Sequence, residues 1–315
     1  MRSILVAIGD LRRAPSGELR KAAALARASG AAVELFHSIV GPDPGTLPGQ
    51  IMTDAAIERF RIVTAARQRS RLERFARSRW LRGLSVRCTA NWDYPPHDAV
   101  VRRALAIRAD LVVAATRHHR LGARLLLTNT DWELIRQCPA PLLLVKSRRQ
   151  YRRPAVLAAV DPFHAHARPA DLDARLLREG AAFARLLHGT LHIFHAYMPL
   201  MTALPVPVAT APLVLVPPEA EEAHGRQIER VIGRLAGAAG IAPSRRHIRM
   251  GEVVDELHAA ARQTRAALVV MGAVSRSALA RLFVGNTAER ALDELGCDVL
   301  VVKPRGFKTR VVRRR

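Results

Sequence analysis

The chain has 315 residues, and its 50 lysines and arginines against 27 aspartates and glutamates give a formal net charge of +23. Hydrophobic residues make up 49% and charged residues 24%, a balance that is typical of globular proteins and excludes a disordered chain. At roughly 100–200 residues per domain, this length predicts two domains. The apolar run at 4–8 is too short for a signal peptide or a membrane span, and the three cysteines are far apart, which disfavours disulfides and structural zinc. We therefore expect a cytoplasmic protein without a membrane span.

Short apolar runs alternate with amphipathic segments along the whole chain. In the first half they predict strands at 4–8, 32–39, 84–91, 110–116 and 141–146, with helices near 17–29, 54–79, 97–108 and 129–137. In the second half they predict strands at 155–160, 190–198, 245–250, 267–273 and 298–303, with helices near 170–187, 219–238, 252–264 and 286–295. Apolar runs without alternation are typical of strands buried on both faces. The order therefore predicts an α/β fold with two tandem doubly wound parallel-sheet domains of Rossmann-like type.

The sequence repeats itself at long range. Residues 110–146 align without a gap over residues 267–303, and Asn129-Thr130 falls on Asn286-Thr287. A repeat of this length indicates a duplicated domain, since solenoid repeats are much shorter. We expect an N-terminal domain at 1–148, a C-terminal domain at 153–305 and a basic tail at 306–315.

One end of the second predicted sheet carries residues suited to a nucleotide. Ligands of open parallel sheets bind beyond the carboxyl ends of the strands, where Asp161 and Gly272 fall. Gly285 comes just before the helix predicted near 286–295, and the free N–H groups at Gly285-Asn286-Thr287 favour a phosphate. The carboxylate of Asp161 could accept a hydrogen bond from an adenine amino group or a ribose hydroxyl. This half therefore predicts an adenine-nucleotide site.

These motifs resemble the universal stress protein family. The tandem domains, the glycine spacing and the sequence GNTAE are similar to that family, and TNTDWELIRQCPAPLLLVK is similar to its tandem-domain E type. The resemblance implies a cytoplasmic stress-response protein, with ATP bound by some members, and pairing of domains or subunits through the last strand, so that the halves pair with each other and a homodimer stays open. Carried onto this chain, it implies nucleotide contacts from Asp161, Ala196, Met271, Gly272, Ser275, Gly285, Asn286 and Thr287.

The chain departs from the family motif in both halves. Ser275 stands where the motif has a glycine and Asn286 where it has serine or threonine, so we expect a weakened ATP site in the C-terminal domain. In the first half every motif glycine is gone, and the aligned positions are Ala115, His118, Thr128 and Asn129. Asp131 there sets a carboxylate beside a predicted helix N-terminus, where it would repel a phosphate. We expect no ATP in the N-terminal domain.

No local motif indicates catalysis or a metal. The sequence contains no GxSxG, GxxxxGK[ST], HExxH or GxGxxG, so we expect a non-catalytic binding or regulatory module. The closest histidines include the pair His192 and His195, with no third ligand at a zinc-site spacing. His37 and His195 occupy matching repeat positions, which favours packing or a backbone hydrogen bond.

The segment Ala196–Pro218 runs 23 residues without a charge. Its six prolines exclude a membrane helix, because each lacks a donor and blocks helical packing. Two interpretations stay open. The segment is either a loop folded over the second core or a cover for an apolar ligand or a protein partner.

Two other functions remain as alternatives. The first is a nucleic-acid-associated protein that uses the basic clusters at 146–153 and 305–315, although 46 of the 50 cations are arginine, as codon bias alone would produce. The second is a slow ATP hydrolase, which would need a metal-holding carboxylate near Asp161.

Overall fold

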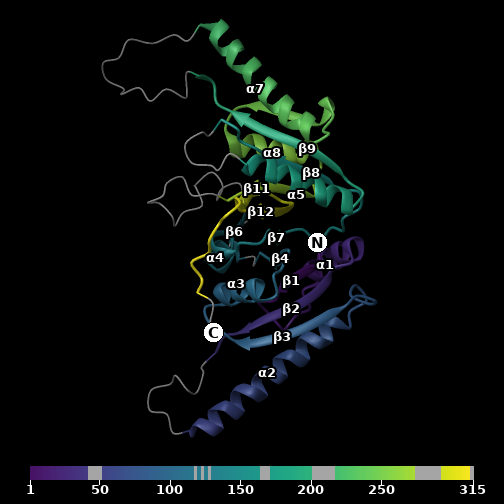
Figure 1. The fold of residues 1–315 in the computed structure, drawn as a ribbon, viewed down its shortest axis with the longest axis vertical. Helices are drawn as coiled ribbons and strands as arrows, with labels where there is room; N and C mark the ends of the chain where they lie inside the picture. The colour runs from purple at the N-terminus through teal and green to yellow at the C-terminus, as the bar shows by residue number, and fades with distance from the viewer. Residues whose placement is uncertain are drawn as a thin grey trace, which may run out of the picture. The chain divides into compact units, whose positions relative to one another are not determined.

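A computed structural model describes residues 1–41, 52–116, 119–121, 124–126, 129–163, 171–200, 217–273 and 292–312. The chain forms two compact units, one of Met1–Tyr151 with Asp298–Arg315 and one of Arg152–Cys297. Both units alternate strands with helices, which confirms the predicted tandem α/β fold (Figure 1).

The first unit is built on a sheet whose neighbouring strands are mostly parallel. In sheet order these are β12 (Asp298–Val302), β7 (Leu142–Val145), β4 (Leu111–Ala115), β1 (Ser3–Ala7), β2 (Ala32–Ile39) and β3 (Val86–Trp92). Its helices are α1 (Ser16–Ser29), α2 (Asp54–Ala76), α3 (Pro96–Ala106) and α4 (Asn129–Gln137). A short antiparallel pair, β5 (His119–Leu121) and β6 (Arg124–Leu126), was not predicted.

The second unit repeats this plan. Its parallel strands follow the order β10 (Arg246–Met250), β9 (Thr190–Tyr197), β8 (Ala155–Ala159) and β11 (Leu268–Gly272). Its helices are α5 (Leu172–Leu186), α7 (Pro218–Ala238) and α8 (Val253–Gln263), with a 3-10 turn η2 (Pro243–Arg245). The predicted helix at 286–295 lies mostly outside the described residues.

The first strand of each unit is the centre of its core. Ile4, Leu5 and Val6 have no exposed surface, and neither do Val156 and Leu157. Strands enclosed on both faces bury every successive side chain, which explains why their sequences are continuous rather than alternating apolar runs. The strand positions could be read from the sequence for this reason.

The last strand of the second repeat completes the sheet of the first unit. β12 pairs antiparallel with β7, with Leu300 opposite Leu143 and Val301 opposite Leu142. The last strands of the two repeats therefore pair with each other, as the family resemblance implies. Because of this pairing, residues 298–305, which the sequence assigns to the C-terminal domain, group with the first unit.

A buried ion pair fixes β12 in this position. Asp298 and Lys21 have 0% and 3% of their side chains exposed, and Asp298 Oδ2 lies 2.8 Å from Lys21 Nζ. The same carboxylate accepts hydrogen bonds from the backbone N–H groups of Lys146 and Ser147 at 3.0 and 2.8 Å and from the Tyr151 hydroxyl at 2.6 Å. Lys21 Nζ also lies 3.7 Å from the centre of the Tyr151 ring. Charge-assisted bonds from three segments thus satisfy one buried carboxylate.

Each of the two basic clusters, at 146–153 and 305–315, has a part that is buried. Lys146 is only 8% exposed, because it follows the buried strand β7, so it is not part of an open cationic surface. Near the C-terminus, Val311 is 8% exposed and the backbone N–H of Arg310 donates to Gln137 Oε1 at 3.2 Å. The tail is therefore held to the first unit at Val311 and at the backbone of Arg310, while the side chains of Lys308 and Arg310 and Val312 stay exposed.

Candidate functional site

Three predicted site residues meet at one edge of the second sheet. β8 lies between β9 and β11, so the chain reverses its strand order at β8. Val160 N–H donates to Phe194 O at 2.9 Å, which continues the β8–β9 register and sets Asp161 level with Ala196. The register between β8 and β11 brings Gly272 to the same edge. The carboxyl ends of adjacent parallel strands at such a reversal are where ligands bind in open α/β sheets.

The structure gives Met271 and Gly272 a packing role. The Met271 side chain is only 9% exposed. A Cβ on Gly272 would lie 2.8 Å from Leu172 Cδ2, closer than real side chains approach, and Leu172 is itself buried at the start of α5. The helix α5 therefore packs closely on β11 at the position where residue 272 has no side chain. Ser275, Gly285, Asn286 and Thr287 lie outside the described residues, as does the part of the Ala196–Pro218 segment at 201–216.

A second carboxylate, which the sequence reading missed, accompanies Asp161. The Asp161 backbone N–H donates to Asp173 Oδ1 at 3.1 Å, and Asp173 lies in the first turn of α5. An acidic residue in the first turn of a predicted helix is the sequence signal that could have found it. The edge of this sheet thus carries two carboxylates.

The first unit has a cavity at the corresponding place. It encloses about 260 Å³ and is lined by Gly9 and Asp10 after β1, Thr116 after β4, and the first turn of α1. Burial raises the pKa of Glu18 in that turn, while hydrogen bonds from backbone N–H groups and the charge of Arg148 act in the opposite direction. Asp131, at the start of α4, is only 3% exposed. Carboxylates of the chain itself thus stand in the first turns of α1 and α4, and that of Glu18 lines the cavity.

The matching histidines form matching backbone bonds. His37 Nδ1 donates to Ile8 O at 2.7 Å, and His195 Nδ1 donates to Val160 O at 3.1 Å. In each unit a histidine of the second strand thus donates a hydrogen bond to the backbone carbonyl at the end of the first strand. The predicted backbone hydrogen bond is confirmed.

His192 is paired differently from the sequence grouping. Its Nδ1 lies 3.0 Å from His247 Nε2, and the two rings stack with centroids 5.2 Å apart. Burial, and then the neighbouring positive charges, lower the pKa of both rings below the usual value of 6.5. Within the described ranges, no three His, Cys, Asp or Glu side chains are placed to hold a metal ion.

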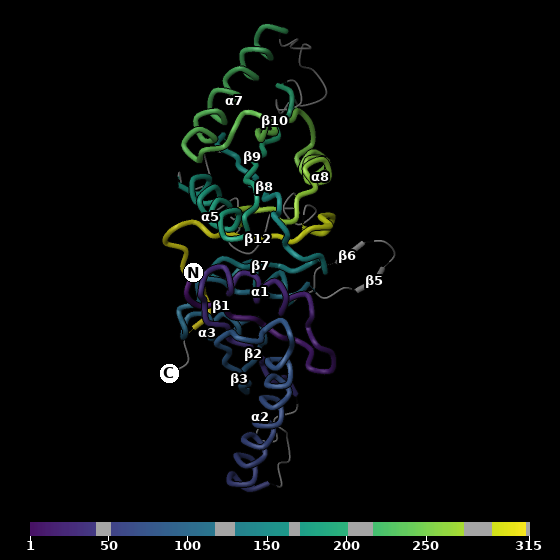
Figure 2. Tube along the Cα trace, turned by 90° about the vertical axis from the view of Figure 1, so that its right-hand side faces the viewer, coloured from purple at the N-terminus to yellow at the C-terminus, as the bar shows by residue number. Residues whose placement is uncertain are grey.

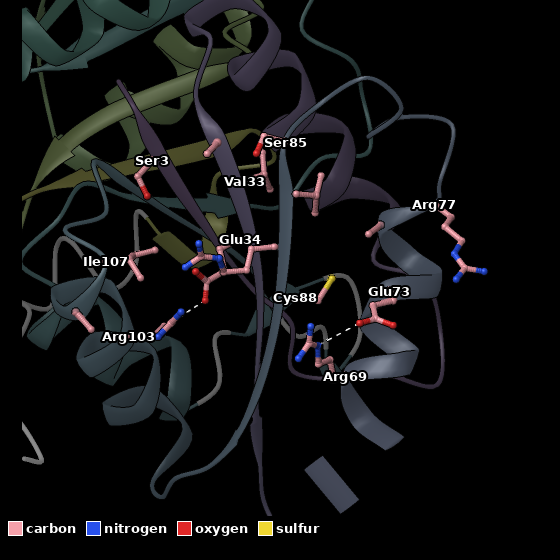
Figure 3. A pocket seen from close by; sticks show the side chains of 15 residues that line it. Ser3, Val33, Glu34, Arg69, Glu73, Arg77, Ser85, Cys88, Arg103 and Ile107 are labelled. Atoms are coloured by element: carbon pink, nitrogen blue, oxygen red, sulfur yellow. Dashed lines mark hydrogen bonds and ion pairs between the residues drawn. The ribbon is translucent and has the colours of Figure 1, made fainter. Parts of the chain in front are cut away.

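A groove lies on the first unit, away from the carboxyl ends of its strands (Figure 3). It encloses about 1030 Å³ between α2 and α3, across β2 and β3. Glu34 accepts from Arg103 Nε at 2.6 Å and Glu73 from Arg69 Nε at 3.1 Å. Burial raises the pKa of the Cys88 thiol to about 11, so it stays protonated and is a poor nucleophile at neutral pH. The groove is thus polar and without an activated nucleophile.

Two tandem α/β units of doubly wound type, each with a mostly parallel sheet, define a duplicated α/β-domain protein. The universal stress protein family matches residues 1–146 and 155–303, and the chain belongs to this family. The family is thus matched twice, once by each copy of the domain.

Individual relatives agree with the tandem arrangement. Universal stress protein E of Escherichia coli K12 is 30% identical over 239 residues, which cover 73% of this chain and 72% of that protein. A Universal stress protein E homolog of Haemophilus influenzae is 27% identical over 68% of each chain. A putative universal stress protein from Pseudomonas aeruginosa UCBPP-PA14 has a TM-score of 0.67 at 26% identity, over 96% of this chain and 94% of that one. The chain is a tandem universal stress protein similar to the E type. Among helices of the described ranges, none has the length and hydropathy that crossing a bilayer requires.

Proposed function

We propose that the chain is a non-catalytic stress-response binding module with one weakened ATP site, in its C-terminal domain. The observation that carries this proposal is the level placement of Asp161 and Ala196 beside Gly272, at the edge where the strand order reverses. A purine and ribose would occupy this edge, and the phosphates would extend to Gly285-Asn286-Thr287. Ser275 and Asn286 weaken the site, because their side chains crowd the approach of phosphates to the backbone.

The N-terminal domain has no nucleotide site in this proposal. Its cavity contains the carboxylates of Asp10 and Glu18, and Asp131 stands at the start of α4. A carboxylate at a helix N-terminus occupies the favourable end of the helix dipole and repels an incoming phosphate. The first domain then serves as a structural or partner-binding half.

Regulation would follow from differential binding. ATP at the second domain changes the conformation of the loop at Gly285 and of the segment Ala196–Pro218, and partner affinity shifts with it. The backbone N–H of Leu200 donates to Glu221 Oε2 at 2.9 Å, so the start of this segment is tied to α7. The thiols of Cys88 and Cys138 are unbridged, which supports a reducing, cytoplasmic location.

Calorimetric titration of MgATP into the full chain tests the proposal. We expect about one equivalent to bind, and Gly285→Val to abolish binding, because a side chain there blocks the phosphate. Thr128→Val, at the aligned position of the first repeat, is the matched control and should leave binding unchanged. Absence of binding to the folded wild-type chain, or retention in Gly285→Val, would refute the site.

One observation favours a slow ATP hydrolase as the second candidate. Asp173 brings a carboxylate to the backbone of Asp161, and such a pair could hold a metal ion beside a phosphate. Magnesium-dependent phosphate release that disappears in both Asp161→Ala and Asp173→Asn would establish hydrolysis. Equal, negligible release by wild type and variants would leave the binding module as the function.

A further inference from the structure

One stretch of the first unit is far more basic than its counterpart in the second. Residues 54–87 contain ten arginines and three acidic residues, a net charge of +7. Residues 218–250, which hold the corresponding helix and strand, contain six arginines and four glutamates, a net charge of +2. Codon bias explains why arginine replaces lysine in both halves. It does not explain why acidic residues offset most of the arginines in residues 218–250 and few of those in residues 54–87.

The basic stretch lies on an outer face of the first unit. α2 packs against β3, the edge strand of the sheet, and the two lie side by side in both views (Figures 1 and 2). Of the 23 residues of α2, only Ile57 and Leu72 are buried. The other residues of the helix, and those of the turn at 77–85 except Leu81, are exposed or half-buried, and part of this surface borders the groove of Figure 3.

Most of these arginines are not neutralised locally. In the groove, Glu34 is paired with Arg103 and Glu73 with Arg69, so both carboxylates are already occupied. Six further side chains are exposed and make no ion pair or side-chain hydrogen bond with another residue of the described ranges: Arg59, Arg67, Arg74, Arg77, Arg82 and Arg87. Uncompensated cations gathered on one face create a positive potential that attracts a polyanion.

Aromatic rings lie within this basic region. Trp80, in the turn after α2, is half-buried, with the guanidinium carbons of Arg79 and Arg20 at 5.4 and 5.7 Å from its ring centre. At the other end of the helix, Phe60 is 40% exposed and its ring lies 6.0 Å from that of Trp92. Arginines interleaved with aromatic rings are the combination by which proteins bind single-stranded nucleic acids, through phosphate contacts and base stacking.

A lipid surface fits this face less well. An interfacial helix needs a continuous apolar face to enter the headgroup region. The apolar side chains of α2 are instead divided, with Ile57 and Leu72 packed inward and Ile62 and Val63 each 60% exposed. The arginines also continue beyond the helix onto β3, along the side of a groove.

We propose that this face, the α2 surface, binds single-stranded nucleic acid. It comprises the six unpaired arginines named above together with Trp80. The phosphates contact the arginines along α2 and the groove, and bases stack near Trp80. The site is separate from the proposed ATP site, so either can fail without the other. It also differs from the clusters at 146–153 and 305–315.

Fluorescence anisotropy with a labelled oligouridine, measured across a salt series, tests the proposal on the full chain. Each phosphate contact to a single strand contributes about 0.7 to the slope of log K against log salt, so removing three contacts should lower the slope by about 2 and the affinity roughly 100-fold near 0.1 M salt. The test variant is Arg74→Gln/Arg77→Gln/Arg87→Gln. The matched control removes the same charge from α7 as Arg226→Gln/Arg230→Gln/Arg234→Gln and should keep the wild-type slope.

A second variant separates stacking from charge. Trp80→Leu should weaken oligouridine binding by about tenfold with no change in salt slope, because it removes a stacking surface and no cation. Thermal melts show that each variant is folded. Equal losses in the α2 and α7 triple variants would reduce the effect to net charge and overturn the proposal. Tighter binding of duplex DNA, or displacement of oligouridine by phosphatidylserine vesicles, would overturn it as well.

Discussion

The two repeats agree in their cores and differ at the ends of their strands and on their long helices. Each has a buried first strand whose end is bonded by a histidine of the second strand, His37 or His195. By the sequence alignment, the fifth strand is preceded by Pro141 in one repeat and begins with Asp298 in the other, and the fourth ends with Ala115 or Gly272. Apolar packing is therefore common to both copies, while the polar and small residues at the strand ends differ between them.

The largest expected effect concerns the buried ion pair of the first unit, between Lys21 and Asp298. Lys21→Met should destabilise that unit by about 3–5 kcal/mol, because it leaves the Asp298 carboxylate buried without its countercharge. All three tryptophans, at 80, 92 and 132, belong to the first unit, so tryptophan fluorescence in urea reports its unfolding. Lys308→Met, an exposed lysine of the same unit, is the matched control. Equal midpoints for the two variants would show that Asp298 does not depend on Lys21.

The lysine that follows β12 predicts a pH dependence in the same unit. Burial lowers the pKa of Lys303 from 10.5 to about 8. Between these values the unfolded chain binds a proton that the folded chain does not, so stability rises with pH through this window, by up to about 3 kcal/mol. Lys303→Met should remove this rise.

The contribution of Lys303 is isolated by the difference in the free energy of unfolding between wild type and Lys303→Met. Burial also raises the pKa of the neighbouring Cys138 thiol to about 12, which acts in the opposite direction because the unfolded thiol ionises first. Tryptophan fluorescence in urea at pH 7 and pH 10 gives the two differences. Lys303→Met should exceed wild type in free energy of unfolding, and this difference should be largest at pH 7 and smaller at pH 10. An advantage that is constant with pH would contradict the lowered pKa.

The sequence predicts those features of the structure that local residue patterns determine. The buried strands were predicted within about two residues, because a continuous apolar run has few other solutions in a parallel sheet. The histidine–backbone bonds were predicted because duplication shows the same residue twice. The pairing of Asp298 with Lys21 and that of His192 with His247 join segments far apart in the chain, and no local pattern encodes such contacts.

The candidate sites show the same limit. Gly272 looks like a nucleotide-motif glycine in the sequence, and only the position of Leu172 reveals its packing role. The charge of the α2 surface is hidden in the sequence because arginines are abundant everywhere. It becomes visible when the ion pairs that neutralise other arginines are known.

The contrast between Gly272 and Ala115 can be tested by making the repeats alike. Gly272→Ala should destabilise the second unit by about 1–3 kcal/mol, because its Cβ would overlap Leu172 Cδ2. Leu172→Val in the same chain should restore part of that loss, since it withdraws the overlapping branch. Far-UV circular dichroism in urea reports both units and should show the loss, while tryptophan fluorescence, which reports the first unit, should not change. A Gly272→Ala chain of wild-type stability would show that α5 can shift and that glycine is not needed for packing.

The smallest expected effect concerns the feature that the repeats share. His195 is 3% exposed, so His195→Phe leaves the Val160 carbonyl without its buried donor and should cost about 1–3 kcal/mol. His37 is half-buried, and water can replace its ring at Ile8 O, so His37→Phe should cost only about 0.5–1.5 kcal/mol. Circular dichroism follows the first variant and tryptophan fluorescence the second. The two bonds join the same chemical groups, and the shorter one, at His37, is the one expected to cost less when lost, so the inequality points to burial as its cause. A larger loss of unfolding free energy in His37→Phe than in His195→Phe would show that burial does not determine what the bond contributes to stability.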